Sequence, residues 1–99
     1  MKYMRGRALN VPLGPGKDET VSQLERRGFP VPRAQVVAAA ATQFAKEESA
    51  LLERQLNPQE TWPGLVFCRR CVVSAGDSMW LTLRYERKSG WTLDSALFE

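Results

Sequence analysis

The chain contains two cysteines, Cys68 and Cys71, whose C-x-x-C spacing occurs in both redox centres and zinc sites. A structural zinc site needs four protein ligands, and the sequence has no histidine and no second cysteine pair to complete one. A redox pair usually opens a helix, whose N-terminus stabilises the thiolate, but Val72 and Val73 continue a strand pattern. Strand residues three apart face opposite sides, so we predict two inert strand cysteines; a zinc site shared between two chains is the alternative.

Asp77, Glu86 and Lys88 stand in an order that resembles the acidic and Glu-x-Lys residues of metal-dependent nucleases. In one predicted strand, Asp77 and Glu86 are about 30 Å apart, because each residue adds roughly 3.3 Å. One magnesium ion, whose ligands lie about 2.1 Å away, cannot bridge that distance. The chain also lacks histidine, the commonest general base. We therefore expect no enzyme activity, no bound metal and no cofactor.

The segment from Pro32 to Leu56 is the predicted centre of the fold, because it reads as one long helix. Pro32 suits the first helical position, strong helix formers fill the interior, and Asn57-Pro58 ends the helix. The side chains expected to face the core are Val37, Phe44 and Leu51 at seven-residue spacing, widened by Ala40, Ala41 and Leu52.

A shorter helix is predicted from Asp18 to Arg27. Asp18 or Thr20 can cap its start, Thr20 and Gln23 have the spacing of a capping box, and Gly28 is the natural residue to end it.

After the long helix, the spacing of apolar residues changes from about 3.6 to two, which predicts strands. They are expected at 65–74, 79–86 and 91–98, and one face of the last strand should carry Trp91, Leu93, Ser95 and Leu97. The expected fold is α+β: the short helix and the long helix pack on a three-stranded antiparallel meander, as one domain of residues 18–99.

Residues 1–17 are predicted to form an extended basic arm or an edge strand next to that domain. Leu9, Val11 and Leu13 alternate with other residues as in a strand, and Pro12 restricts such a strand to the edge of a sheet.

Two features favour a protein partner. A helix of about 37 Å is long for a domain whose radius of gyration is near 13 Å, so the part from Lys46 to Leu56 is expected to overhang. A three-stranded sheet also leaves an open edge and an uncovered second face. The predicted partner-binding residues are Leu51, Leu52, Leu56 and Trp80.

Basic residues at the N-terminus allow a second function. Lys2, Arg5, Arg7 and Lys17 lie in a segment without acidic residues, although the net charge of the chain is only +3. The order of LNVPL, a short helix, the Gly28 loop and the long helix in residues 5–44 resembles a ribbon-helix-helix DNA-binding domain. The resemblance implies a dimer that lays paired N-terminal strands in the major groove.

The sequence thus favours a small non-catalytic binding or regulatory module that acts through protein–protein contacts as a homodimer. A DNA-binding regulator that uses the basic arm is the alternative. No apolar run approaches the ~20 residues of a membrane span, and the N-terminus lacks the apolar region of a signal peptide. We therefore expect a cytoplasmic protein without membrane contact.

Overall fold

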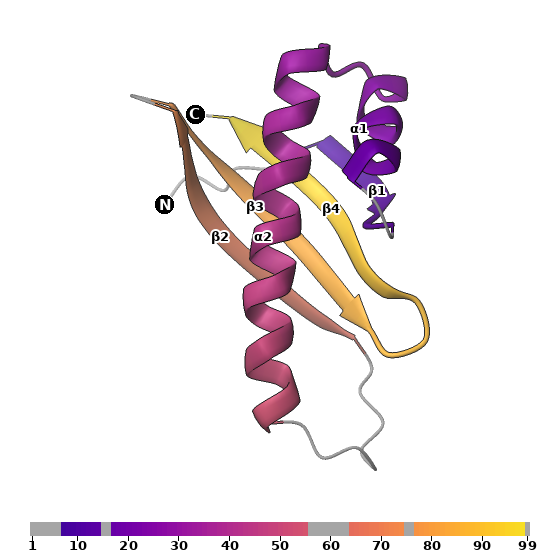
Figure 1. Cartoon of the computed structure of the whole chain (residues 1–99), viewed down its shortest axis with the longest axis vertical. Helices are drawn as coiled ribbons and strands as arrows, with labels where there is room; N and C mark the ends of the chain where they lie inside the picture. The colour runs from indigo at the N-terminus through magenta and orange to yellow at the C-terminus, as the bar shows by residue number, and fades with distance from the viewer. Residues whose placement is uncertain (1–6, 15–16, 56–63, 75–76, 99) are drawn as a thin grey trace.

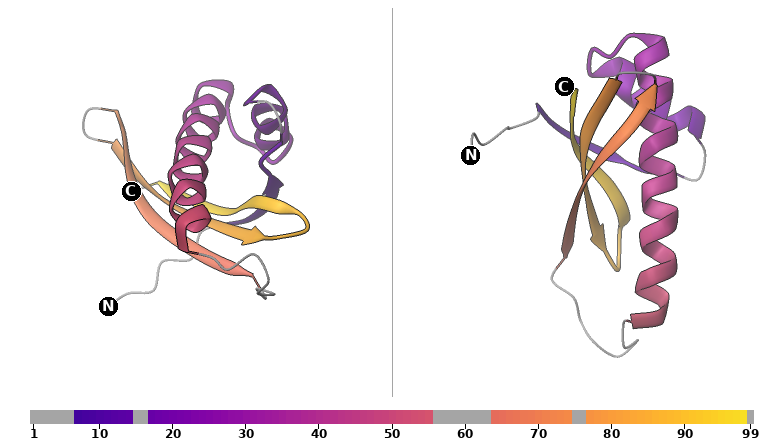
Figure 2. Two further views of the ribbon diagram at one scale, coloured as in Figure 1. Left: turned by 60° about the horizontal axis from the view of Figure 1, so that its bottom comes forward. Right: turned by 90° about the vertical axis from the view of Figure 1, so that its left-hand side faces the viewer.

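The computed structural model describes residues 7–14, 17–55, 64–74 and 77–98. Its elements are β1 (Arg7–Pro12), α1 (Lys17–Arg26), α2 (Val31–Gln55), β2 (Leu65–Ser74), β3 (Asp77–Glu86) and β4 (Gly90–Phe98). The strands form one four-stranded antiparallel sheet in the order β1-β4-β3-β2. Both helices pack on one face of this sheet, which we call the inner face (Figure 1). No described helix or strand covers the other face, the outer face (Figure 2).

The α+β class is confirmed, but the prediction of three strands was wrong because β1 joins the sheet. Residues 7–12 pair antiparallel with β4, from Arg7 opposite Ala96 to Pro12 opposite Thr92. The edge strand, one of the two predicted forms of the N-terminal segment, is therefore the correct one for these residues. Leu9 and Val11 are buried in the core, and this burial holds the strand in place. Pro12 is tolerated because it stands at the end of an edge strand.

Helix α1 begins earlier than the capping prediction implied. It starts at Lys17, so Thr20 lies inside the helix and is buried rather than acting as the cap. The end of the helix is as predicted: Gly28 has a φ of 99°, its N–H donates to the Glu25 carbonyl, and the Phe29 N–H donates to the Leu24 carbonyl. These two bonds form a Schellman motif, which favours glycine at the left-handed position.

Helix α2 buries the predicted line only as far as Phe44. Val37 and Phe44 are buried, whereas Leu51 is 46% exposed and Leu52 is half-buried. A strict seven-residue repeat drifts about 20° per heptad around a straight helix, so Leu51 has turned away from the sheet. The half-buried Glu48 and Leu52 continue the buried stripe in its place.

The predicted face of β4 was wrong after Leu93 because the strand contains a bulge. Residues 82 and 83 of β3 pair with 95 and 93 of β4, so Asp94 is an extra residue. An extra residue moves every later side chain to the opposite face. Ala96 therefore lies in the core, and Leu97 faces outward opposite Trp80.

The core lies between α2 and the inner face of the central strands. Its buried residues include Ala34, Val37, Ala38, Ala41 and Phe44 of α2, Leu24 of α1, Met79, Leu81 and Leu83 of β3, and Leu93 and Ala96 of β4. Short alanine side chains allow α2 to approach the sheet closely. Among the described residues, no helix combines the length and the hydropathy needed to cross a membrane.

Candidate protein-interaction surface

The outer face is organised by the register of the strands. Arg70 of β2, Trp80 of β3 and Leu97 of β4 lie opposite one another in one row across the sheet. The next row contains small and polar residues, Cys68, Thr82, Ser95 and Ala8. The last row contains Val66, Arg84, Thr92 and Pro12. The face therefore has apolar groups toward both ends and a polar middle.

Three large apolar side chains are exposed on this face. Val66 is 66% exposed, Val72 is 73% exposed and Trp80 is 37% exposed. Val66 and Val72 lie on the edge strand β2, and Trp80 lies on the neighbouring strand β3. Aromatic side chains on an exposed face are typical anchors of protein interfaces.

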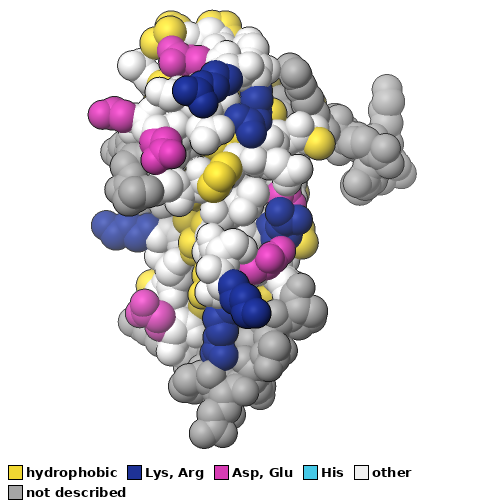
Figure 3. Space-filling view, turned by 90° about the vertical axis from the view of Figure 1, so that its right-hand side faces the viewer, with side chains coloured by type: hydrophobic (Ala, Val, Ile, Leu, Met, Phe, Trp, Pro, Cys, Tyr) yellow, Lys and Arg dark blue, Asp and Glu magenta, His cyan; other side chains and the backbone are white. Residues whose placement is uncertain are grey.

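Charged groups on the outer face partly neutralise each other. The Arg84 guanidinium lies 3.4 Å from the Glu86 carboxylate and 3.7 Å from Asp94 Oδ1. Asp94 Oδ1 is buried and accepts no hydrogen bond from any described residue, so this arginine is its electrostatic partner. Over the side of the molecule that carries α1, acidic and basic side chains are interspersed (Figure 3).

On the inner face of β2, Arg69 connects the edge strand to α2. Its guanidinium lies 4.2 Å from the centre of the Phe44 ring, pairs with Glu47 and donates to Glu48 Oε1 at 3.0 Å. Hydrogen bonds from Gln43 and Arg69 hold the pKa of Glu47 below its usual range, and Glu47 in turn raises the pKa of Arg69. The guanidinium is thus held against α2 instead of extending past the edge of the sheet.

The two cysteines lie on opposite faces of β2, as the strand alternation predicts. Cys68 is exposed on the outer face opposite Thr82, and Cys71 is half-buried on the inner face opposite Met79. Burial raises the pKa of the Cys71 thiol, which makes it a poor nucleophile at neutral pH. This arrangement does not bring the two sulfurs together within one chain.

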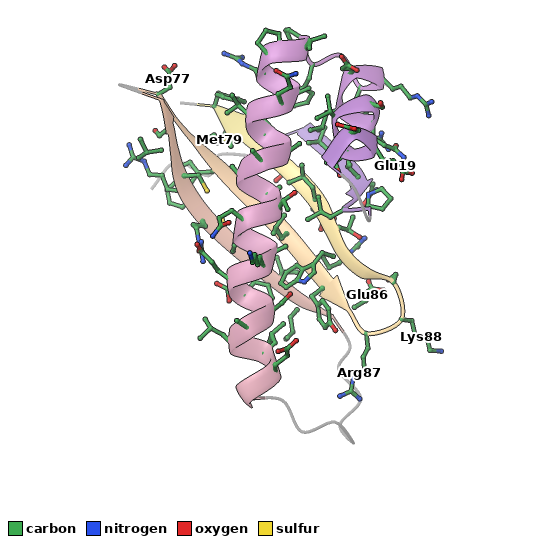
Figure 4. The ribbon with its side chains drawn as sticks, viewed as in Figure 1. Glu19, Asp77, Met79, Glu86, Arg87 and Lys88 are labelled. Carbon is green, nitrogen blue, oxygen red and sulfur yellow. The ribbon has the colours of Figure 1, made fainter. Side chains whose placement is uncertain are left out.

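The nuclease-like residues are also separated. Figure 4 places Asp77 at one end of β3, and Glu86, Arg87 and Lys88 at the other end beside the hairpin to β4. Among the described residues, no group of three potential metal-ligating side chains is close enough to hold an ion.

The predicted partner-binding residues divide between two surfaces. Trp80 lies on the outer face, whereas Leu51 and Leu52 lie on α2, on the other side of the sheet. Leu56 lies outside the described residues. Val66 and Val72 were not among the predicted residues, because both alternating sets of β2 contain apolar residues and one arginine, so the sequence does not show which set faces outward.

The predicted nucleic-acid-binding residues cannot be placed. Lys2 and Arg5 lie outside the described residues, and so do the side chains of Arg7 and Lys17, although their backbones belong to β1 and α1. DNA binding by the basic arm therefore stays a prediction.

No protein-family model matches the chain, and neither a curated protein nor a solved structure shows significant similarity to it.

Proposed function

We propose that the protein is a small non-catalytic binding module that contacts a protein partner through the outer face of its sheet. The observation that supports this most directly is the exposure of Trp80 between Arg70 and Leu97 in a row that crosses three strands. A tryptophan flanked by an arginine and a leucine offers a broad apolar contact with hydrogen-bond donors at its margin.

The composition of this face suits a protein partner. Its ionic groups include both signs, since Arg84 is accompanied by Glu86 and Asp94. A strongly basic face would favour nucleic acid, and a strongly acidic one would favour a basic ligand. Here the apolar residues are the more distinctive group, and we expect the partner to present an apolar patch with a mixed polar rim.

The proposal is tested by capturing partners from native lysate, with and without nuclease, using the intact protein and two variants. Trp80→Ala should weaken binding of a captured partner by about 2 kcal/mol, or roughly 30-fold in dissociation constant. Val31→Ala is the matched control, because Val31 is an exposed apolar residue at the start of α2, remote from the outer face.

Leu51→Ala tests the other predicted surface on the same captured partner. Loss of binding in Leu51→Ala with full binding in Trp80→Ala would move the interface from the outer face to α2. Capture that disappears after nuclease treatment would contradict a protein partner and favour the DNA-binding alternative.

A further inference from the structure

The two edges of the sheet are built differently. Three features obstruct pairing along the free edge of β1. Pro12 lacks an N–H, Asn10 forms a bulge with a φ of 52°, and the Arg27 side chain donates to the carbonyls of Leu9 at 2.6 Å and Asn10 at 3.3 Å. Bulges, prolines and covering side chains are the devices that keep an edge strand from pairing with another chain.

The edge formed by β2 is less obstructed: its register shift lies near the end of the strand, between Val72 and Ser74, and its charged residues are Arg69 and Arg70. The strand is ten residues long, contains no proline or glycine, and pairs regularly with β3 from Leu65 to Val72. No described strand pairs with its other side. Val66 and Val72 are 66% and 73% exposed near its two ends, so both side chains are available for contact across this edge.

We propose that a second copy of this chain pairs antiparallel with β2 across a two-fold axis at Arg69. In this register Val66 of each copy lies opposite Val72 of the other, because the two valines are three residues before and after Arg69. Cys68 lies opposite Arg70 of the second copy. The two sheets join into one continuous sheet, and all helices lie on the same side of it.

Neighbouring registers fit the sequence less well. An axis at Arg70 places that arginine opposite itself and sets Val66 opposite Ser74. An axis at Cys68 sets Val66 opposite Arg70 and leaves Val72 opposite Gly64, which lies before the strand begins. Only an axis at Arg69 pairs both valines with each other and keeps the regular stretch of residues 66–72 of both strands within the ladder.

This register sets Arg69 opposite itself on the inner face, a contact that would be unfavourable between free guanidinium groups. Each Arg69 is already paired with Glu47 and Glu48 of its own helix and lies against the Phe44 ring. Every Arg69 guanidinium therefore comes with two carboxylates, and the inner side of the interface carries no excess positive charge at its centre.

The hydrogen bonds of this interface are comparable in number to those of established complexes. An antiparallel ladder gives on average one backbone hydrogen bond per residue pair, so residues 66–72 supply about seven. A typical specific interface has about ten. Two pairs of valines, one on each side of the axis, add apolar contact on the outer face.

The inference rests on and deepens the proposed function, because it identifies one partner as a second copy and leaves Trp80 and Leu97 outside the new ladder on the same outer face. The two proposals fail separately. A monomer that still binds a partner through Trp80 overturns the dimer alone. A dimer whose partner binding is insensitive to Trp80→Ala overturns the outer-face proposal alone.

The test measures the dimer dissociation constant of the full chain by sedimentation equilibrium, from micromolar to ~100 µM protein. Val66→Lys should weaken the dimer about tenfold or more, because it sets an ammonium against a valine twice per dimer. Adding Val72→Glu to Val66→Lys should restore most of the affinity, because each new ammonium then faces a carboxylate. Adding Val72→Lys instead should weaken the dimer further.

Both valines are largely exposed, so the variants should fold, and circular dichroism with thermal melting verifies this. Val31→Lys is the control, because Val31 is 50% exposed on α2 and should not change the affinity. Three results would overturn the proposal: a wild-type chain that stays monomeric at ~100 µM, a dimer that Val66→Lys leaves unchanged, or equal affinities for the Lys/Glu and Lys/Lys pairs.

Discussion

Replacing Phe44 by alanine should cause a large loss of stability. The side chain is 2% exposed at the centre of the core, and its ring also supports the Arg69 guanidinium at 4.2 Å. Removing a buried phenylalanine ring costs about 3–5 kcal/mol, and the arginine also loses a cation–π contact. Small domains have a total stability of about 5–15 kcal/mol, so Phe44→Ala removes a substantial share of it.

Urea unfolding followed by circular dichroism measures this loss. With an m-value of about 2 kcal/mol per molar, a loss of about 4 kcal/mol lowers the midpoint by about 2 M. Phe44→Leu keeps most of the buried volume and should lower it by a smaller amount, which provides a reading if the alanine variant does not fold.

Leu51→Ala is the matched control, because Leu51 lies seven residues further along α2 and is 46% exposed. It should cost about 1 kcal/mol or less. Equal midpoint shifts for Phe44→Ala and Leu51→Ala would refute the assignment of the buried face of α2. They would also contradict the explanation that residues at seven-residue spacing turn away from the sheet by Leu51.

Three further outcomes are expected. Glu47→Gln should destabilise the protein at neutral pH. Because the folded-state pKa of Glu47 is lowered, the stabilisation that its carboxylate contributes is lost as the pH falls. In an acid-unfolding series, the difference in free energy of unfolding between variant and wild type should therefore close below a pH of about 4. Cys68 should react with a thiol-alkylating reagent much faster than Cys71, and mass spectrometry would show the difference. A chelator should leave the thermal stability unchanged, whereas a loss of stability would favour a metal shared between two chains. Duplex DNA binding should be weak and should be lost at physiological salt. The DNA-binding alternative would be favoured by binding that persists at physiological salt and depends on the basic arm. In that case, replacing Arg5 and Arg7 together by alanine should lower the slope of log affinity against log salt concentration by about two.

The sequence predicted the elements whose signals are local. The long helix, the β3 alternation of Met79, Leu81 and Leu83, and the glycine that ends α1 are each encoded within a few consecutive residues. Their positions in the structure agree with the predictions because burial of each apolar stripe and local hydrogen bonding favour the same conformation.

The features that were missed depend on residues far apart in the chain. Pairing of β1 with β4 joins Arg7 to Ala96, and six residues interrupted by Asn10 and Pro12 gave no local signal strong enough to predict it. The bulge at Asp94 is also invisible in the sequence, because a strand with one extra residue has the same composition as a regular one. Both errors changed which side chains belong to each face of the sheet.

Which side chains lie on the outer face of the sheet determines which residues can form the candidate site. The bulge turns Leu97 outward beside Trp80, and without it the outer face would carry a single large apolar group in that row. β1 replaces β4 at the opposite edge of the described sheet, where the Asn10 bulge, Pro12 and Arg27 obstruct pairing, so β2 is left as the less obstructed of the two edges. The outward position of Trp80 follows from local alternation in β3, whereas the outward position of Leu97 beside it and the obstruction of the opposite edge depend on long-range pairing. The two proposals are compatible, because pairing along the β2 edge would leave Trp80 and Leu97 of the outer face outside the ladder.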